Sequence, residues 1–346
     1  MKTRAALLYG VEDLRVEEVA LPSLQEGELL VKVGSALTCG TDLKAFLRGG
    51  HKAMSPLPAR AGHEWAGTVA MVGPGATGFK EGMRVVGANS APCQHCFYCR
   101  RGRHSLCENI VYNWGTFAEH IIVPRRIVEQ NVYPLPEHVS FAEGAFIEPL
   151  ACVVHGIEEA EVHLGDTVAI TGVGSIGLMF IVLAKLKGAR VIASGRFAPR
   201  LELAKAFGAD EVIDIDAVDD QVQAVRALTE RGRGADIVIE AVGKPEAWEK
   251  SIAMARKGGT VILFGGCPAG TSVDLDTTNL HYGELTLKGI YHHSPRYVKI
   301  ALDLIVQGAF DPKKFIKDTI PLSRVEEALR LVKKGEGLKY AIVPEE

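Results

Sequence analysis

Four cysteines within fifteen positions form the densest group of reactive side chains in the sequence. They are spaced C-x2-C-x2-C-x7-C, and three further cysteines lie elsewhere. An odd number of cysteines argues against a disulfide framework, whereas clustered thiolates are suited to metal ligation. Four thiolates complete a tetrahedral zinc and leave no position open for a substrate. The spacing therefore predicts a structural zinc rather than a reaction at Cys93, Cys96, Cys99 and Cys107.

A zinc module that binds nucleic acid is the nearest alternative for this loop. Its basic residues lie between the third and fourth cysteines and are Arg100, Arg101, Arg103 and His104. Cations near a four-thiolate zinc offset its excess negative charge, which explains them without nucleic acid. The basic run has no interleaved aromatic residues for base stacking, and the net charge of the chain is -3. We expect no nucleic-acid partner.

A second set of potential metal ligands is dispersed along the first 150 residues. It consists of Cys39, His63, Glu64 and Glu148. Taken singly, a cysteine is most often a small buried hydrophobe and a histidine a structural residue. Taken together, one thiolate, one imidazole and one carboxylate, with water in the fourth place, are the ligand set of an open catalytic zinc.

A glycine-rich segment, Gly172-Val-Gly-Ser-Ile-Gly177, follows a predicted strand at 167–171 and opens a predicted helix. In that setting the G-x-G-x-x-G pattern is typical of a dinucleotide site, because the glycines permit a tight turn and the helix N-terminus accepts a pyrophosphate. A turn without a ligand is the alternative. We expect cofactor contacts from Gly172, Gly174, Ser175, Ile176 and Gly177.

The end of the next predicted strand bears on the choice between NAD and NADP. An NAD enzyme places Asp or Glu there to accept from the ribose 2′-hydroxyl. This chain has Gly195, which leaves room for a phosphate, and its potential donors are Ser194, Arg196 and Arg200. The sequence favours NADP over NAD. The alternative is that Arg196 is a solvated surface charge.

Two kinds of secondary structure must position these groups. Residues 1–135 have the pattern of short strands separated by turns, and a helical stretch at 140–161 follows. Strands then alternate with helices, which predicts a doubly wound parallel sheet covered on both faces. The tail ends in a connecting stretch at 317–320, a helix and a strand at 339–343, and it is too small to be a domain. The fold class is therefore α/β.

In these motifs the sequence resembles the zinc-containing medium-chain dehydrogenase/reductase family of alcohol dehydrogenases. The motifs follow in that family's order and intervals: Cys39-Gly-Thr-Asp42, Gly62-His-Glu, the four-cysteine loop, Glu148-Pro-Leu and the glycine-rich turn. The Gly-His-Glu and Glu-Pro-Leu versions look most like the sorbitol, threonine and butanediol dehydrogenase branch. The resemblance implies a GroES-like β catalytic domain at 1–150 with a structural-zinc lobe at 88–110, a Rossmann domain at 151–291, and a return to the catalytic domain at 292–346.

The resemblance also implies the reaction. Zinc acts as a Lewis acid on the oxygen of a secondary alcohol, of polyol, amino alcohol or cyclitol type, while a hydride passes to the nicotinamide and a ketone forms. Each chain would hold two zincs, one catalytic and one structural. Cys39 and His63 would bind the catalytic zinc, with a carboxylate from Glu64 or Glu148. Which glutamate binds directly stays open.

A proton must also leave the alcohol. Thr41 resembles the family's relay hydroxyl, and His51 could continue the path to solvent; the alternatives are a plain turn residue and an exposed histidine. His292 and His293 lie where polyol-type relatives carry polar residues that face the substrate, but this chain departs from the Arg-Tyr of sorbitol dehydrogenases. That departure puts a sorbitol-like substrate in doubt.

Two other classes of function stay open: a zinc-free reductase of the same superfamily, and a non-enzymatic binding protein on the same fold. The first residues lack the apolar length of a signal peptide, and the longest apolar run is too short to span a bilayer. We therefore expect a cytoplasmic protein with a small-molecule substrate and no membrane partner. The resemblance implies a homo-oligomer, a tetramer.

Overall fold

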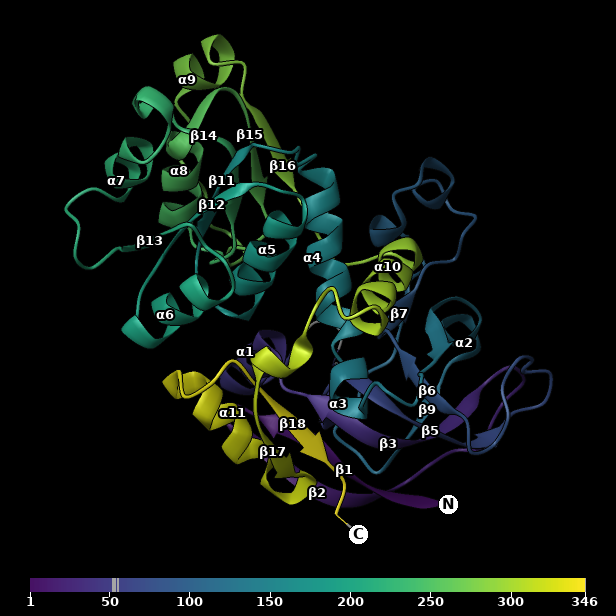
Figure 1. Ribbon diagram of the computed structural model, residues 1–346. Helices are drawn as coiled ribbons and strands as arrows, with labels where there is room; N and C mark the ends of the chain where they lie inside the picture. Colours follow the sequence, from purple (N-terminus) through teal and green to yellow (C-terminus); the bar gives the residue numbers. More distant parts are fainter. Residues whose placement is uncertain (52–53, 55, 346) are drawn as a thin grey trace. The chain divides into compact units, whose positions relative to one another are not determined.

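The computed structural model describes residues 1–51, 54 and 56–345 (Figure 1). The chain divides into two compact units. The first combines Met1–Ala151 with His293–Glu346, and the second is Cys152–His292. Among the helices of the described residues, none is long and apolar enough to cross a bilayer.

The first unit is built around antiparallel strands. Its main sheet has the order β10-β6-β5-β3-β18-β17, with β9 also paired to β3. These strands are β3 (Leu29–Leu37), β5 (Glu64–Val72), β6 (Arg84–Gly87), β9 (His120–Val123), β10 (Val132–Pro134), β17 (Ile316–Pro321) and β18 (Lys339–Val343). Two smaller sheets comprise β1 (Lys2–Gly10), β2 (Asp13–Ala20), β4 (Ala59–Arg60), β7 (Ser90–Ala91) and β8 (Val111–Tyr112).

Strand β3 is the centre of the main sheet, because it is paired along both edges. Near its end, Leu37 lies opposite Glu64 of β5 on one side and opposite Ala341 of β18 on the other. The core that this sheet covers contains large side chains without solvent exposure, among them Phe46, Trp65 and Phe117. A strand from the end of the chain, β18, is thus paired with one from its beginning, β3.

The helices of the first unit begin with α1 (Gly40–Arg48), α2 (Arg125–Asn131) and α3 (Phe141–Gly144), and α10 (Pro295–Val306) and α11 (Val325–Lys334) follow in the tail. Helix α4 (Ile147–Glu159) contains the boundary between the units. The short 3-10 segments are η1 (Cys99–Arg101), η2 (His104–Leu106), η4 (Pro312–Phe315) and η5 (Leu322–Arg324).

Two expectations for this unit need correction. The single helical stretch at 140–161 is two helices, α3 and α4, because Pro149 has no N–H to donate to the preceding turn and is tolerated only in the first turn of a new helix. The connecting stretch at 317–320 is strand β17, parallel to β18. The sequence did not predict this strand because most of its residues are polar and exposed, as is common for an edge strand.

The second unit is a parallel six-stranded sheet with the order β13-β12-β11-β14-β15-β16. The strands are β11 (Thr167–Thr171), β12 (Arg190–Gly195), β13 (Glu211–Asp214), β14 (Ala235–Glu240), β15 (Ala255–Leu263) and β16 (Thr286–Gly289). The helical segments are α5 (Ser175–Leu186), α6 (Ala198–Ala206), α7 (Gln221–Ala227), η3 (Glu230–Gly232), α8 (Pro245–Met254) and α9 (Thr277–Tyr282).

The strand order of this sheet confirms the prediction of a doubly wound fold. From β11 the chain runs outward through β12 to β13, then returns to β14 on the other side of β11 and continues to β16. With right-handed crossovers, the two directions of winding place helices on opposite faces of the sheet (Figure 1). The direction reverses between β11 and β14, and ligands of such sheets bind outside the strand ends at this switch point.

Candidate functional site

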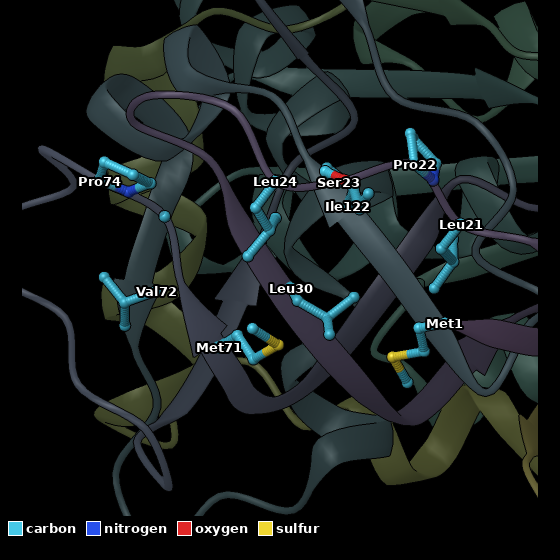
Figure 2. Close-up of a pocket in the computed structure, with 11 residues that line it drawn as sticks. Met1, Leu21, Pro22, Ser23, Leu24, Leu30, Met71, Val72, Pro74 and Ile122 are labelled. Atoms are coloured by element: carbon cyan, nitrogen blue, oxygen red, sulfur yellow. The ribbon is translucent and has the colours of Figure 1, made fainter.

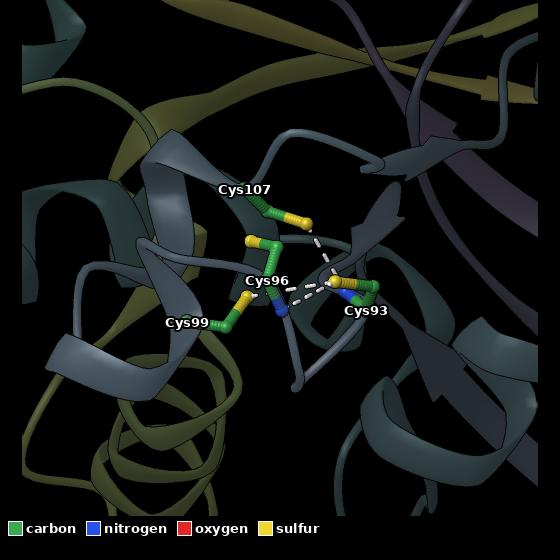
Figure 3. Close-up of side chains that lie close together, drawn as sticks. All are labelled: Cys93, Cys96, Cys99 and Cys107. Atoms are coloured by element: carbon green, nitrogen blue, oxygen red, sulfur yellow. Dashed lines mark hydrogen bonds between the residues drawn. The ribbon is translucent and has the colours of Figure 1, made fainter.

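The four-cysteine group lies in the loop between β7 and β8 (Figure 3). Among the described residues no cysteine forms a disulfide, and the four sulfur atoms of this group lie within 4.8 Å of one another. Backbone amides point at the sulfurs: the N–H of Cys93 donates to Cys107 Sγ at 3.1 Å, and that of Cys96 donates to Cys93 Sγ at 3.3 Å. The N–H of Cys99 lowers the pKa of the Cys96 thiol to about 6. Burial raises the pKa of Cys99 to about 12, so the four thiols are not uniformly stabilised as thiolates. What fits a closed zinc site is the clustering of four soft donors.

The first residue of the dispersed set is fixed by the start of helix α1. Cys39 is its N-cap, and Cys39 Sγ accepts from the backbone N–H of Thr41 at 3.5 Å. In return the carboxylate of Asp42 accepts from the N–H of Cys39 at 3.1 Å, which completes a capping box. The thiol is therefore held by the helix terminus itself, and Thr41 lies against it.

Asp42 also orients His63. The Nδ1 of His63 donates to the other oxygen of Asp42 at 3.0 Å, and both side chains are buried. Burial alone would lower the pKa of His63, but Asp42 and Cys39 raise it well above the ordinary value. With Nδ1 committed to a carboxylate, Nε2 is the nitrogen left for a metal, the usual arrangement around a ligating histidine.

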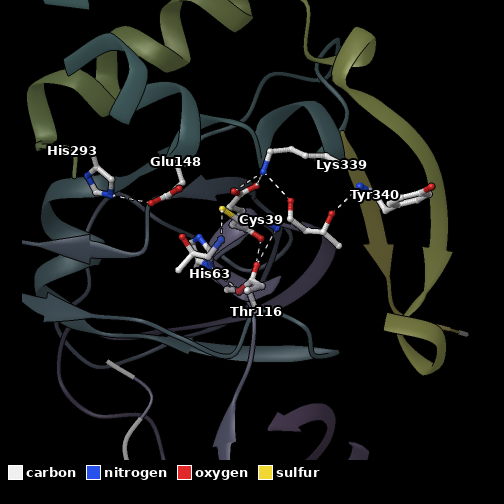
Figure 4. A network of polar contacts seen from close by, with 11 residues as sticks. Cys39, His63, Thr116, Glu148, His293, Lys339 and Tyr340 are labelled. Carbon is white, nitrogen blue, oxygen red and sulfur yellow. Dashed lines mark hydrogen bonds and ion pairs between the residues drawn. The ribbon is translucent and has the colours of Figure 1, made fainter. Parts of the chain in front are cut away.

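Glu64 lies beside these two residues and is held by a lysine from the tail, Lys339, which is labelled in Figure 4. Lys339 Nζ contacts both oxygens of Glu64, at 2.6 and 2.7 Å, and donates to the carbonyl of Thr38 at 2.9 Å. Burial alone would lower the pKa of Lys339, but Glu64 and Cys39 raise it. Ligand atoms of Cys39, His63 and Glu64 lie within 4.8 Å of one another, so the three could hold one metal ion.

Glu148 stands in the first turn of α4 and is buried. Its carboxylate lies 3.7 Å from His293 Nε2, and the same nitrogen lies 3.0 Å from Asn89 Oδ1 (Figure 4). Burial raises the pKa of Glu148 to about 7. His293 therefore belongs to the polar surroundings of this glutamate. His292 is the last residue of the second unit.

Aromatic rings link the proposed relay histidine to the cluster. The ring of Trp114 lies 5.4 Å from that of His51 and 4.8 Å from that of His63, measured between centroids. His51 is exposed. The sequence reasoning singled out both histidines but not Trp114.

In the second unit, the glycine-rich turn connects β11 to α5 at the switch point. A Cβ at Gly172 would lie 2.8 Å from Val242 Cγ2, and one at Gly177 only 1.8 Å from the carbonyl oxygen of Gly172, so neither position accepts a side chain. The hydroxyl of Ser175, at the start of α5, is buried without a partner among the described residues. An orphaned donor at a helix N-terminus fits a phosphate group.

The residues at the end of β12 are engaged within their own unit. Ser194 is buried, its hydroxyl donates to the carbonyl of Ile170 at 3.4 Å and it accepts from Gln221 at 2.9 Å. This hydroxyl therefore already has two hydrogen-bond partners within its own unit, and its contact with a 2′-phosphate stays a prediction. A Cβ at Gly195 would lie 2.4 Å from Val173 Cγ2, so packing also requires that glycine.

The two arginines near this strand end differ in setting. Arg196 is exposed and pairs with Asp216 at 3.0 Å. Arg200 is half-buried, and one of its guanidinium nitrogens lies 3.9 Å from the point where a Cβ of Gly174 would stand. Arg200 thus lies beside the glycine-rich turn, and Arg196 lies at the edge of the unit.

A separate pocket in the first unit has a volume of about 400 Å³ and an apolar lining (Figure 2). Its lining includes Met1, Leu21, Leu24, Leu30, Met71 and Ile122. The candidate metal ligands and the glycine-rich turn lie elsewhere, so this pocket has no part in the site.

The comparisons with known proteins bear on both units. The alcohol dehydrogenase GroES-like domain profile matches residues 25–137, and the zinc-binding dehydrogenase profile matches residues 175–307. A sorbitol dehydrogenase of Bacillus subtilis (strain 168) is 30% identical over 351 residues, covering 99% of this chain and 97% of the relative. One from Bombyx mori is 31% identical, covering 98% and 97%.

Among solved structures, a protein of Sinorhizobium meliloti 1021 bound to NADP superposes with a TM-score of 0.90 at 32% identity, covering 99% of this chain and all of that one. The predicted combination of a GroES-like domain with a Rossmann domain is confirmed. The chain therefore belongs to the zinc-containing medium-chain dehydrogenase/reductase family, in its sorbitol dehydrogenase-like branch, and is an enzyme of the dehydrogenase class.

Proposed function

We propose that the protein is a zinc-dependent oxidoreductase that transfers a hydride between a secondary alcohol and a nicotinamide cofactor, with a ketone as product. The observation that carries this proposal is the convergence of Cys39, His63 and Glu64 within 4.8 Å, a thiolate, imidazole and carboxylate set. Zinc held there would supply a Lewis acid that lowers the pKa of an alcohol.

We assign Cys39, His63 and Glu64 as the protein's ligands to the catalytic metal. Lys339 does not exclude Glu64 from this role, because a carboxylate has about four lone-pair positions and one ammonium leaves some of them for a metal. Glu148 would approach the metal or hold its water from the side of His293. Zinc retention in Glu64→Gln compared with Glu148→Gln distinguishes the direct ligand from its neighbour.

Two groups would move the proton. Thr41 lies next to the proposed metal ligands, because its backbone N–H donates a hydrogen bond to Cys39 Sγ. Its hydroxyl would accept the proton of the alcohol. His51 would then pass the proton to solvent. Its ring lies near the cluster, because Trp114 packs against both His51 and His63. Thr41→Val removes the hydroxyl at nearly constant volume. It should lower kcat far more than it changes zinc content.

The second zinc would be structural and held by Cys93, Cys96, Cys99 and Cys107. Elemental analysis therefore tests the proposal as a whole. Two zincs per chain, with activity lost on chelation, are expected. A single zinc that resists chelation would contradict the catalytic site, and so would activity without zinc, which a zinc-free reductase would show.

The cofactor would bind at the glycine-rich turn, and we propose a preference for NADP over NAD. Gly172, Gly174, Ser175, Ile176 and Gly177 would surround the pyrophosphate, with the orphaned Ser175 hydroxyl as one donor. Arg200 and Arg196 would hold the 2′-phosphate, and Gly195 would leave it room. The NADP bound to the S. meliloti relative supports this preference. The test is the ratio of kcat/KM for the two cofactors.

The substrate would be a polyol or a related secondary alcohol. The sorbitol dehydrogenases among the relatives support this class, whereas the histidines at His292 and His293 argue for a substrate other than sorbitol itself. A screen of polyols, amino alcohols and cyclitols with both cofactors identifies it. Lack of turnover on every alcohol in a zinc-loaded sample would favour a binding protein instead.

Domain roles and assembly complete the proposal. Residues 1–150, including the lobe at 88–110, would form the catalytic domain, residues 151–291 would bind the cofactor, and residues 292–346 would return to the first. The expected tetramer and the expected cytoplasmic location stay predictions. Light scattering tests the tetramer, and fractionation tests the location.

A further inference from the structure

Two adjacent side chains beside the candidate metal ligands carry hydrogen-bond donors that no described residue accepts. They are the amide nitrogen of Asn113 and the indole nitrogen of Trp114, and both atoms are shielded from solvent. The Asn113 residue as a whole is only 8% exposed. A donor that is buried without an acceptor destabilises the fold. Two such donors side by side at a site therefore point to a ligand that pairs with them.

Trp114 faces the metal cluster directly. Its ring lies 4.8 Å from that of His63, which also contacts Asp42. The indole thus covers the imidazole that we assign as a metal ligand. A substrate oxygen at that metal would bring its neighbouring atoms close to Trp114.

Asn113 reaches the same surroundings through the glutamate side of the cluster. Its backbone N–H donates to the carbonyl of Asn89 at 2.7 Å, and the side chain of Asn89 contacts His293 at 3.0 Å. His293 in turn lies 3.7 Å from Glu148. Hydrogen bonds thus connect Asn113 to the side of the candidate site that holds His293 and Glu148, and ring packing places Trp114 on the side that holds His63.

The loop that carries the pair is fixed in place. The N–H groups of Gly115 and Thr116 both donate to the carbonyl of Gly62, at 2.8 and 3.2 Å, and the hydroxyl of Thr116 donates to the carbonyl of Glu64 at 3.2 Å. Gly62 has a φ of +92°, and a Cβ there would lie 2.6 Å from the nitrogen of Phe117. The donors are thus held before any ligand arrives, and preorganised donors lose little entropy on binding.

An orphaned indole alone does not mark a site. Trp65 also has an unpaired Nε1, but its side chain is fully buried in the core of the main sheet and packs against Gly87. Trp114 differs because two histidine rings border it and because a second orphaned donor is next to it in sequence.

We propose that Asn113 and Trp114 determine specificity by donating hydrogen bonds to a second oxygen of the substrate, on the carbon next to the one that is oxidised. This inference rests on the proposed alcohol dehydrogenase function and narrows its substrate class to vicinal diols and longer polyols. A site built to pair with a hydroxyl rejects an analogue without it, because the donors are then left buried and unsatisfied.

The test compares 2,3-butanediol with 2-butanol, which lacks only the second hydroxyl, in the zinc-loaded protein. Asn113→Leu removes the amide at similar volume, and Trp114→Phe keeps an aromatic ring on His63 while removing the N–H. Wild-type protein should prefer the diol by at least tenfold in kcat/KM. In each variant, kcat/KM for the diol should fall about three- to tenfold, which corresponds to the loss of one hydrogen bond. The value for the mono-alcohol should change little.

The outcomes separate the two proposals. Equal losses on both alcohols, or no loss on the diol, overturn the role of the pair while leaving the dehydrogenase function intact. No turnover of either alcohol overturns the proposed function instead. In that case the role of the pair is tested by binding alone. If the wild-type protein binds the diol more tightly than the mono-alcohol and Trp114→Phe loses this difference, the role is supported. If the wild-type protein binds both alcohols equally, the role is overturned. A zinc content and melting temperature near those of wild type show that each variant is folded.

Discussion

Lys339 and Glu64 form a buried ion pair across strand β3. Lys339 is the first residue of β18 and Glu64 the first of β5, and the ammonium contacts both carboxylate oxygens, at 2.6 and 2.7 Å. Neither side chain has more than 3% of its surface exposed. The pair places a positive charge beside two of the proposed metal ligands, the Glu64 carboxylate and the Cys39 thiol, so it would reduce the repulsion between them in their anionic forms.

Replacing Lys339 with Met should destabilise the protein strongly. Removing one partner of a buried ion pair leaves the other charge unpaired, which costs about 3–5 kcal/mol in the free energy of unfolding. Urea denaturation of the zinc-loaded protein measures this. The double variant Lys339→Met/Glu64→Gln should regain much of that stability, whereas equal losses in the single and double variants would show that the two residues are not coupled.

Removing the carboxylate of Asp42 should weaken binding of the catalytic zinc. Asp42→Ala leaves the Nδ1 of His63 and the N–H of Cys39 without their acceptor, and loss of such a supporting group typically costs 10- to 100-fold in metal affinity. Competition with a chromophoric chelator gives the affinity without an activity assay. Asp42→Asn keeps one acceptor and should lie between Asp42→Ala and wild type; an unchanged affinity in Asp42→Ala would refute the role of Asp42.

Cys99→Ser should remove the structural zinc and spare the catalytic one. The expected zinc content is one per chain, the melting temperature should fall, and kcat/KM should change less than stability does, because a closed four-thiolate site offers no position to a substrate. Cys267→Ser, outside both clusters, is the matched control and should retain two zincs. A larger loss in kcat/KM than in stability would place chemistry at this site.

Cofactor selectivity should respond to Arg196 and its partner. Arg196→Asp should shift the kcat/KM ratio toward NAD by about tenfold or more, because a hydrogen bond to a charged group contributes about 1.5–3 kcal/mol. Asp216→Asn releases Arg196 from its ion pair and should shift the ratio toward NADP. If neither substitution moves the ratio, Arg196 is only a surface charge, and Arg200 becomes the sole candidate for the phosphate.

Glu240 should affect cofactor binding through the turn after β14. Its buried carboxylate accepts from the N–H groups of Val242 and Gly243, at 2.7 and 2.8 Å, and Val242 packs against Gly172 of the glycine-rich turn. Glu240→Ala should raise the Kd for NADPH, followed by its fluorescence, about tenfold, since both N–H groups of the turn lose their shared acceptor, Glu240 Oε1. Glu240→Gln keeps one oxygen as an acceptor, so its Kd for NADPH should be close to that of the wild type. Lower stability with an unchanged Kd would show a purely structural role.

Local patterns in the sequence predicted those parts of the protein that local physics determines. The strand at 167–171 and the glycine-rich turn after it were predictable because hydrophobic pattern and glycine spacing are short-range signals. Asp42 could have been found from its place three residues after Cys39, a capping-box spacing. The interruption between α3 and α4 could also have been predicted, because a proline such as Pro149 is tolerated only in the first turn of a helix.

Other features depend on contacts that no window of sequence contains. Lys339 meets Glu64 across 275 positions, and nothing around Lys339 marks it as buried. Gly195 was interpreted as room for a phosphate, but the close approach of Val173 also demands a glycine there. The hydrogen bond between Gln221 and Ser194 spans 27 positions, so no short window of sequence contains it.

The position of Lys339 also has a consequence for biosynthesis. Ribosomes add about 5–20 residues per second, so roughly 15–55 s separate the synthesis of Glu64 from that of its counter-charge. During that interval the nascent chain already contains Cys39, His63 and Glu64 but lacks the ammonium that balances them. The proposed ligand cluster therefore gains its counter-charge only after translation has reached β18, which would make metal insertion into the mature geometry a late event in the life of the chain.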